Sequence, residues 1–112
     1  MVMEEYVVAD LVKSNYIINA AILDPDGFII AAVPGDEKTK QLLSKLAEVQ
    51  YVIDNTSQTT IIAEKMTIMI NLLAKKHALV VGCESDSNLG FVRQTISKAV
   101  ARLDGYLQSK KR

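Results

Sequence analysis

The sequence is poor in the residues that build disulfide frameworks, metal centres and nucleophilic active sites. Its 112 residues include one cysteine, one histidine and no tryptophan. A single cysteine, Cys83, cannot form an internal disulfide, which predicts a reducing, cytoplasmic compartment. Cys83 and His77 cannot form a zinc site without carboxylates from elsewhere in the chain. We therefore expect neither a disulfide scaffold nor a metal site.

The chain also has no net charge and no long apolar run. Thirteen basic side chains balance thirteen acidic ones, whereas nucleic-acid binding usually needs a basic face. The short basic runs Lys75–Lys76 and Lys110–Arg112 are better explained as a solvated turn and tail. The start of the chain is acidic (Glu4, Glu5) where a signal peptide is basic, and no apolar stretch approaches the ~20 residues of a membrane span. We expect no nucleic-acid partner, no signal peptide and no transmembrane segment.

No catalytic or cofactor-binding constellation is present. His77 and Cys83 lie on one predicted strand, about 20 Å apart at ~3.3 Å per residue, which is beyond the hydrogen-bond reach that a base and a nucleophile need. The five glycines fit neither phosphate-loop nor dinucleotide spacing. Asp24 and Asp26 flank Pro25 in a tight turn, and a calcium loop would need several more oxygen ligands. The sequence predicts no catalytic residue, no cofactor and no enzyme activity.

An ordinary folded composition remains, with 49% hydrophobic and 23% charged residues, which fits one domain over residues 1–112. Hydrophobic spacing and turn residues predict, in order, a helix over Glu4–Ser14, strands over Tyr16–Leu23 and Phe28–Val33, a helix over Asp36–Asp54, strands over Thr59–Ala63, Met66–Leu73 and His77–Cys83, and a helix over Leu89–Gln108. Strands that are apolar on both faces need helices on both sides. The predicted fold is an α/β three-layer sandwich, a five-stranded antiparallel sheet with one helix on one face and two on the other.

The two long helices differ in how many apolar faces they carry. At 100° per residue, the apolar residues of the last helix fall within one sector of roughly 100°. The middle helix has one such stripe and a second line, Leu43, Ala47 and Tyr51, displaced from the first by roughly 140°. Three residues on that second line cannot reach the same sheet. They predict a second packing surface against another molecule, although scattered exposed apolar residues would give the same pattern.

The third predicted strand extends this surface. If the hairpins pair in sequence, Thr59–Ala63 lies at a sheet edge, and it carries neither charge nor proline to prevent pairing with another chain. We therefore predict a dimer or partner interface formed by Leu43, Ala47, Tyr51, Thr59, Ile61 and Ala63.

Two segments resemble the Roadblock/dynein-light-chain family. Asn19–Ala31 is similar to the opening hairpin of Roadblock domains, in which an apolar strand meets an Asp-x-x-Gly turn, here Asp24 to Gly27. Ala78–Val81, followed by Asn88–Arg93, is similar to that family's last strand and the start of its last helix. The resemblance covers most of the chain and implies the Roadblock/profilin-like sandwich. The compact chain looks most like a minimal prokaryotic-type member.

The resemblance implies a function and a site. Roadblock domains form dimers in which the middle helices lie side by side and the third strands join two sheets, which matches the interface predicted above. Members commonly work with Ras-like small GTPases or act as dynein light chains. We expect a non-enzymatic homodimeric scaffold or regulator that docks a small GTPase. The alternatives are a small-molecule sensor of the PAS or GAF type and a dynein-type cargo adaptor.

Overall fold

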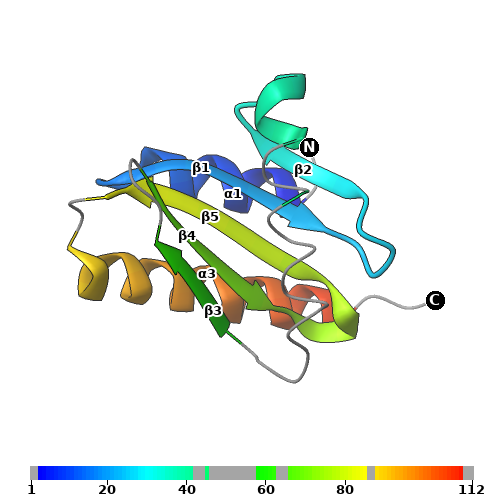
Figure 1. Cartoon of the computed structure of the whole chain (residues 1–112). Coiled ribbons are helices and arrows are strands. Elements are labelled where there is room, and N and C mark those ends of the chain that lie inside the picture. Colours follow the sequence, from blue (N-terminus) through cyan, green and yellow to red (C-terminus); the bar gives the residue numbers. More distant parts are fainter. Residues whose placement is uncertain (1–2, 42–44, 46–57, 63–65, 86–87, 110–112) are drawn as a thin grey trace.

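The structure is a computed structural model that describes residues 3–41, 45, 58–62, 66–85 and 88–109 (Figure 1). Its elements are α1 (Met3–Lys13), β1 (Ile17–Leu23), β2 (Ile29–Val33), β3 (Gln58–Ile62), β4 (Met66–Leu72), the short 3-10 helix η1 (Ala74–Lys76), β5 (Ala78–Glu84) and α3 (Leu89–Ser109). The strands form one antiparallel sheet in the order β2-β1-β5-β4-β3. The predicted α/β fold with an antiparallel sheet is confirmed, and the ends of most elements differ by one residue from their prediction.

The predicted turn between the first two strands is fixed by one aspartate. The Oδ1 atom of Asp24 accepts hydrogen bonds from the backbone N–H groups of Asp26 and Phe28, each at 2.9 Å. Gly27 has φ +89°, a conformation that glycine adopts without steric cost. The carboxylate of Asp24 is thus used to hold the backbone of the hairpin, as expected for a structural turn.

Besides Ile30, which is 38% exposed inside β2, the expectation that the first two strands are fully buried was wrong at three further positions. Tyr16 precedes β1 with φ +76° and is exposed. The β1–β5 register shifts between Ile17 and Asn19, and Ile18 within this irregularity is 42% exposed. Phe28 lies before β2 and is 69% exposed. The sequence pattern counted all three as strand core because they are apolar, but a bulge and a turn direct them outward.

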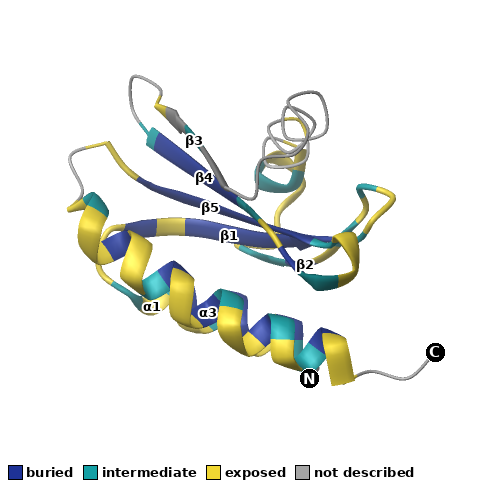
Figure 2. Ribbon diagram, turned by 90° about the horizontal axis from the view of Figure 1, so that it is seen from below, coloured by how far each residue is buried: buried dark blue, intermediate teal, exposed yellow. Residues whose placement is uncertain are grey.

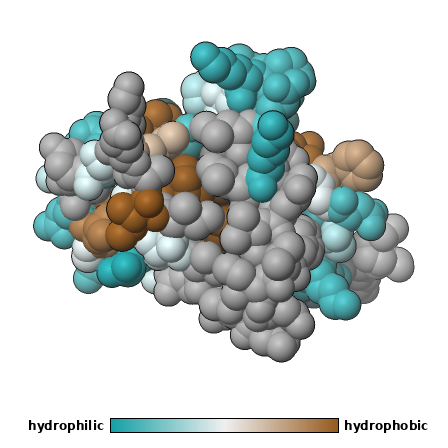
Figure 3. All heavy atoms as spheres, in the orientation of Figure 1, coloured by the Kyte–Doolittle hydropathy of each residue, from teal (hydrophilic) through white to brown (hydrophobic). Residues whose placement is uncertain are grey.

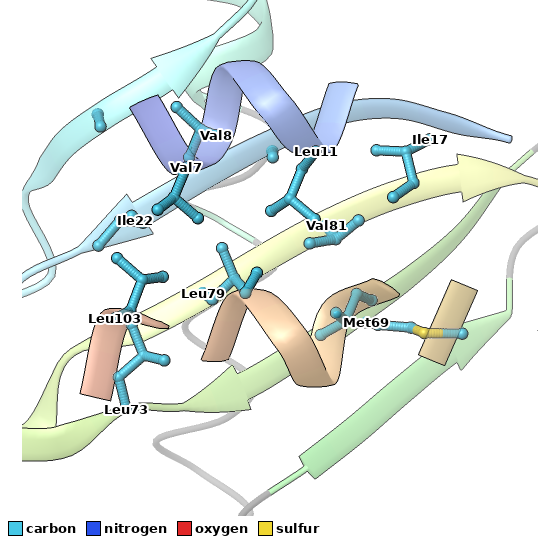
Figure 4. Packing of buried hydrophobic residues seen from close by; sticks show 14 of the residues in the cluster. Val7, Val8, Leu11, Ile17, Ile22, Met69, Leu73, Leu79, Val81 and Leu103 are labelled. Atoms are coloured by element: carbon cyan, nitrogen blue, oxygen red, sulfur yellow. The ribbon is translucent and has the colours of Figure 1, made fainter. Parts of the chain in front are cut away.

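The main core lies between the sheet and the helices α1 and α3, which cover the same face (Figure 2). Figure 4 shows Val7 and Leu11 of α1 beside Leu79 and Val81 of β5, with Leu103 of α3 nearby. The predicted single apolar stripe of the last helix is confirmed, since its buried residues are Val92, Ile96, Ala99, Leu103 and Leu107. A second cluster, Ala21, Leu23, Ile68, Ile70 and Val80, lies on the other face of the sheet.

The second helix begins on that other face. Residues 37–41 and 45 are helical, and residues 37–41 lie across the sheet from α1 and α3 (Figure 2). Asp36 is its N-cap: Oδ2 accepts the backbone N–H of Thr39 at 3.2 Å. Hydrogen bonds from the side chain of Thr39 and from its backbone hold the pKa of Asp36 below its ordinary value. Because most of the predicted helix lies outside the described residues, the full three-layer arrangement stays a prediction.

A polar side chain is buried on the same face. Asn19 of β1 is 5% exposed, pairs with Gly82 of β5, and its Nδ2 lies 4.0 Å from the Sδ of Met66. Its Oδ1 has no hydrogen-bond partner among the described residues. A Cβ atom at Gly82 would overlap Oδ1 of Asn19 and would lie 2.9 Å from the Sδ of Met66. Glycine is therefore required at position 82 by this asparagine.

Candidate functional site

The strongest candidate site is the free edge of β3. This strand ends the sheet, and within the described part of the chain its one strand neighbour is β4. Its five residues, Gln58–Ile62, include no charge and no proline, the two features that most often protect an edge. The predicted position of the third strand at a sheet edge is confirmed.

The hydrogen bonds of the neighbouring strands show which backbone groups face outward. The N–H of Leu73, just after the end of β4, donates to the C=O of His77, before β5, at 2.7 Å. The backbone groups of Leu73 therefore point toward the β5 side of the ladder. In an antiparallel ladder the direction of the backbone groups alternates along each strand. The backbone groups of Met69, four residue pairs from Leu73, therefore face β5, whereas those of Ile68 and Ile70 face β3.

The same alternation settles the orientation of β3. Ile61 pairs with Ile68 and Thr59 with Ile70, so the N–H and C=O groups of Thr59 and Ile61 face β4. The backbone groups of Gln58, Thr60 and Ile62 consequently face away from the sheet. These three residues present the donors and acceptors that an added strand would use.

The outward residues carry no charge. Ile62 is 74% exposed, the highest value among the large hydrophobic residues described, and Thr60 is half-buried. Figure 3 shows hydrophobic surface on the side of the molecule where Figure 1 places β3 and β4. An exposed isoleucine next to outward-facing backbone groups on an uncharged edge favours association with another apolar strand.

The predicted interface residues are only partly covered by the description. Leu43, Ala47, Tyr51 and Ala63 lie outside the described residues. Thr59 and Ile61 are in β3, but their side chains are not described, and their backbone groups face β4.

The sequence analysis did not single out Thr60 and Ile62, which carry the outward groups. Alternation along β3 was visible in the sequence, but its phase depends on the β4 register, which no local motif encodes.

The candidates for chemistry are separated as expected. Cys83 is fully buried near the end of β5, and its Sγ lies 3.5 Å from the C=O of Thr67. His77 precedes the start of the same strand, and its Nδ1 lies 3.1 Å from the C=O of Lys75. Among the residues that the structure describes, no group of three or more His, Cys, Asp or Glu could hold a metal ion. In that same part of the chain, no helix combines the length and apolarity needed to cross a bilayer.

A shallow groove of about 320 Å³ lies between α1 and α3. The Arg102–Asp10 ion pair, at 3.3 Å and with both side chains about half exposed, joins its two walls. Val7 and Leu11 form its floor and are already buried in the core. The exposed part of the groove combines this ion pair with the ring of Phe91, which is 41% exposed.

Comparison with known proteins supports the fold. No family model matches the chain, and no curated protein matches its sequence. A Roadblock/LC7 domain from Streptomyces avermitilis is similar in structure, with a TM-score of 0.82 and 14% identity over 94% of this chain and 98% of that one. Myxococcus xanthus MglB has a TM-score of 0.76 and 19% identity over 95% of each chain. Acanthamoeba castellanii profilin IB has a TM-score of 0.66 and 21% identity over 94% and 98%.

These likenesses, all at low identity, concern the fold. The chain has the Roadblock fold, as the sequence resemblance predicts, and shares its general architecture with profilins. Because Roadblock-type proteins and a profilin share this architecture, the fold alone does not determine the activity of the chain. The function must be argued from the exposed surface.

Proposed function

We propose that this chain is a member of the Roadblock family that acts as a non-enzymatic homodimeric scaffold or regulator. The observation that carries the proposal is the uncharged free edge of β3, with the backbone groups of Thr60 and Ile62 directed outward and Ile62 74% exposed. In the proposed dimer, two β3 strands pair and extend the sheet across both subunits. The proposal includes the three-layer arrangement and a cytoplasmic location, which a single buried thiol favours.

The proposed partner is a Ras-like small GTPase. The sequence resemblance supports this class, because Roadblock domains commonly work with such proteins. The scaffold would act by binding one conformation of the GTPase more tightly than the other, since only a difference in affinity can shift a conformational equilibrium. Residues Leu43, Ala47 and Tyr51 belong to the same proposal as the helical part of the interface.

The dimer is tested by the solution mass of matched variants. Ile62→Lys places a charge on the free edge of β3 and should give a monomer in sedimentation equilibrium, with unchanged circular dichroism. Thr60→Pro should do the same, because it removes an outward N–H and leaves the β3–β4 hydrogen bonds intact. Phe28→Lys is the control: Phe28 is 69% exposed but lies near β2, so this variant should remain a dimer. A wild-type monomer, or a dimer that tolerates both edge variants, would refute the β3 interface.

The GTPase clause needs its own test. Titration with small GTPases encoded near this protein's gene, each in its GDP and GTP state, should reveal one that binds with a clear preference for one state. If none of these GTPases bound in either state, the proposed GTPase partner would be refuted and the proposed scaffold would still stand. A small-molecule sensor and a dynein-type adaptor stay as alternative predictions, and a ligand-dependent rise in melting temperature would favour the sensor.

A further inference from the structure

The second free edge of the sheet belongs to β2, on the side opposite β3. Within the described part of the chain, β2 has β1 as its one strand neighbour. It carries an exposed residue, Ile30, at 38%. The edge of β2 that does not pair with β1 borders α1 and the residues that lead into the second helix (Figure 1). This edge takes no part in the proposed dimer and calls for a separate explanation.

The direction of the β2 backbone groups follows from the far end of β5. The N–H of Glu84 donates to the C=O of Tyr16 at 2.9 Å, so Glu84 faces β1. By alternation the backbone N–H and C=O of Val80 also point toward β1, where Val80 pairs with Ala21. The backbone groups of Ala21 in β1 therefore point toward β5, and those of its neighbours Ala20 and Ile22 point toward β2.

The pairs between β1 and β2 complete the assignment. Val33 pairs with Ala20 and Ala31 pairs with Ile22, so both of these β2 residues face β1. Ala32 lies between them, and its N–H and C=O face away from the sheet. The position of Gly35 agrees, because a Cβ atom built there would lie 3.8 Å from the C=O oxygen of Ala32.

A groove of about 210 Å³ lies along this edge. All five residues of β2 line it, together with Glu5 and Val8 of α1 on one wall and Gly35 and Lys40 on the other. Because consecutive strand residues point to opposite faces, a cavity that contacts every one of them lies along the backbone edge and not over one face. Gly35 has no side chain to cover the outward C=O of Ala32, so the groove reaches this backbone group.

We propose that the groove along β2 binds an extended peptide segment of a partner protein, which adds a sixth strand to the sheet. Such a strand supplies N–H and C=O groups at the spacing that Ala32 requires, as in other complexes formed by strand addition. Ile30 and Val33 point to opposite faces of the sheet, so apolar residues on both faces of the added strand would contact them. An acidic residue would lie next to Lys40, which contributes a positive charge to the wall.

The size and shape of the groove favour a peptide over a second copy of this chain. Five residues of strand span about 17 Å, and the cavity holds about 210 Å³. The groove is also concave between α1 and Lys40, so a second copy, which carries the same two walls, could not approach closely with its own β2. A single extended chain fits between them.

The test begins with heptapeptides selected on the immobilised wild-type protein from a phage-displayed random library. Binding of the synthetic peptides is then measured by fluorescence anisotropy. Gly35→Val fills the groove above Ala32 and should weaken binding at least tenfold, and Lys40→Glu should weaken binding of acidic peptides by a similar factor. Ile62→Lys, on the opposite edge, should leave the affinity unchanged. The melting temperature of each variant verifies that it is folded.

N-methylated peptides test the backbone pairing itself. Methylation of the alternate amides that face β2 should abolish binding, whereas methylation of the intervening amides should have little effect, because these face away from the edge. Equal effects of the two methylation patterns, or full affinity for both Gly35→Val and Lys40→Glu, would overturn the proposal. It would also fail if no peptide bound at millimolar concentration, or if Ile30→Lys changed the solution mass, which would indicate a second copy at this edge. None of these outcomes bears on the β3 dimer, so the two proposals can fail separately.

Discussion

Replacing Gly82 by alanine should destabilise the protein strongly for so small a change. The added Cβ atom overlaps Oδ1 of Asn19 and lies 2.9 Å from the Sδ of Met66. Asn19 is 5% exposed, so its amide cannot turn into solvent without movement of its neighbours. Position 82 lies in β5, which pairs with a strand on each side, so the backbone cannot retreat either.

The two contributions to the free energy have opposite signs. Overpacking a well-filled core costs about 1–3 kcal/mol, whereas replacing a strand glycine by alanine recovers about 0.5–1 kcal/mol of backbone entropy. We expect a net loss of about 1–2 kcal/mol. For a domain of about 100 residues this lowers the melting temperature by about 5–10 °C.

A double-mutant cycle assigns the loss to the asparagine. Asn19→Ala removes the overlapping atoms, so Gly82→Ala should be close to neutral in that background, with a coupling energy of about 1–2 kcal/mol. Urea denaturation at a fixed protein concentration measures each variant, because the proposed dimer makes stability depend on concentration. Gly105→Ala is the matched control: among the described residues, no atom beyond its chain neighbours and its own helix backbone lies within 4 Å of a Cβ atom built there. Alanine in a helix should stabilise the protein by about 0.5–1 kcal/mol. If Gly82→Ala were neutral, or equally harmful with and without Asn19, the close packing inferred at this position would be wrong.

Three further predictions concern the helices. Leu103→Ala empties a fully buried site beneath α3 and should cost about 3–4 kcal/mol in urea denaturation; Val100→Ala, at a half-buried position, should cost clearly less. Asp36→Ala removes the N-cap of the second helix and should lower the melting temperature at neutral pH. Because the pKa of Asp36 is held below its ordinary 3.8, the stabilisation is present above that pH and is lost as pH falls through the folded-state pKa, so the two proteins should converge in acid. Asp104→Ala removes the acceptor of the Ala74 N–H, a 2.8 Å bond between α3 and η1, and should cost about 1–2 kcal/mol by urea denaturation.

The elements that could be predicted from the sequence are those with a strong local signal. Asp24 and Gly27 define their turn by side-chain chemistry that operates within four residues. The last helix follows from a single apolar stripe, of which Leu103 is a buried member. Ile18 and Phe28 were misplaced because apolar character does not reveal a bulge or the end of a strand.

The candidate site shows a related limit. An uncharged third strand at a sheet edge was predictable, because its composition and the hairpin order both indicate it. Which residues face outward was not, since the phase of β3 is set by its pairing with Ile68 and Ile70 on β4. The predicted interface therefore includes Thr59 and Ile61, whose backbone groups face β4, and lacks Ile62. The groove along β2 could not be predicted at all, because it depends on how α1 and Lys40 approach the strand in space.

The two edges of this sheet differ in the kind of strand they can accept. The β3 edge is uncharged and carries Ile62 at 74% exposure, whereas the β2 edge lies in a groove between α1 and Lys40. An edge of the first kind can meet an identical edge, while an edge inside a groove admits only a slender segment. Three strands separate the two edges, about 19 Å at ~4.8 Å per strand spacing. Pairing at β3 should therefore leave peptide binding at β2 unchanged, so that a dimer of this chain would present two peptide grooves at the outer ends of one continuous sheet.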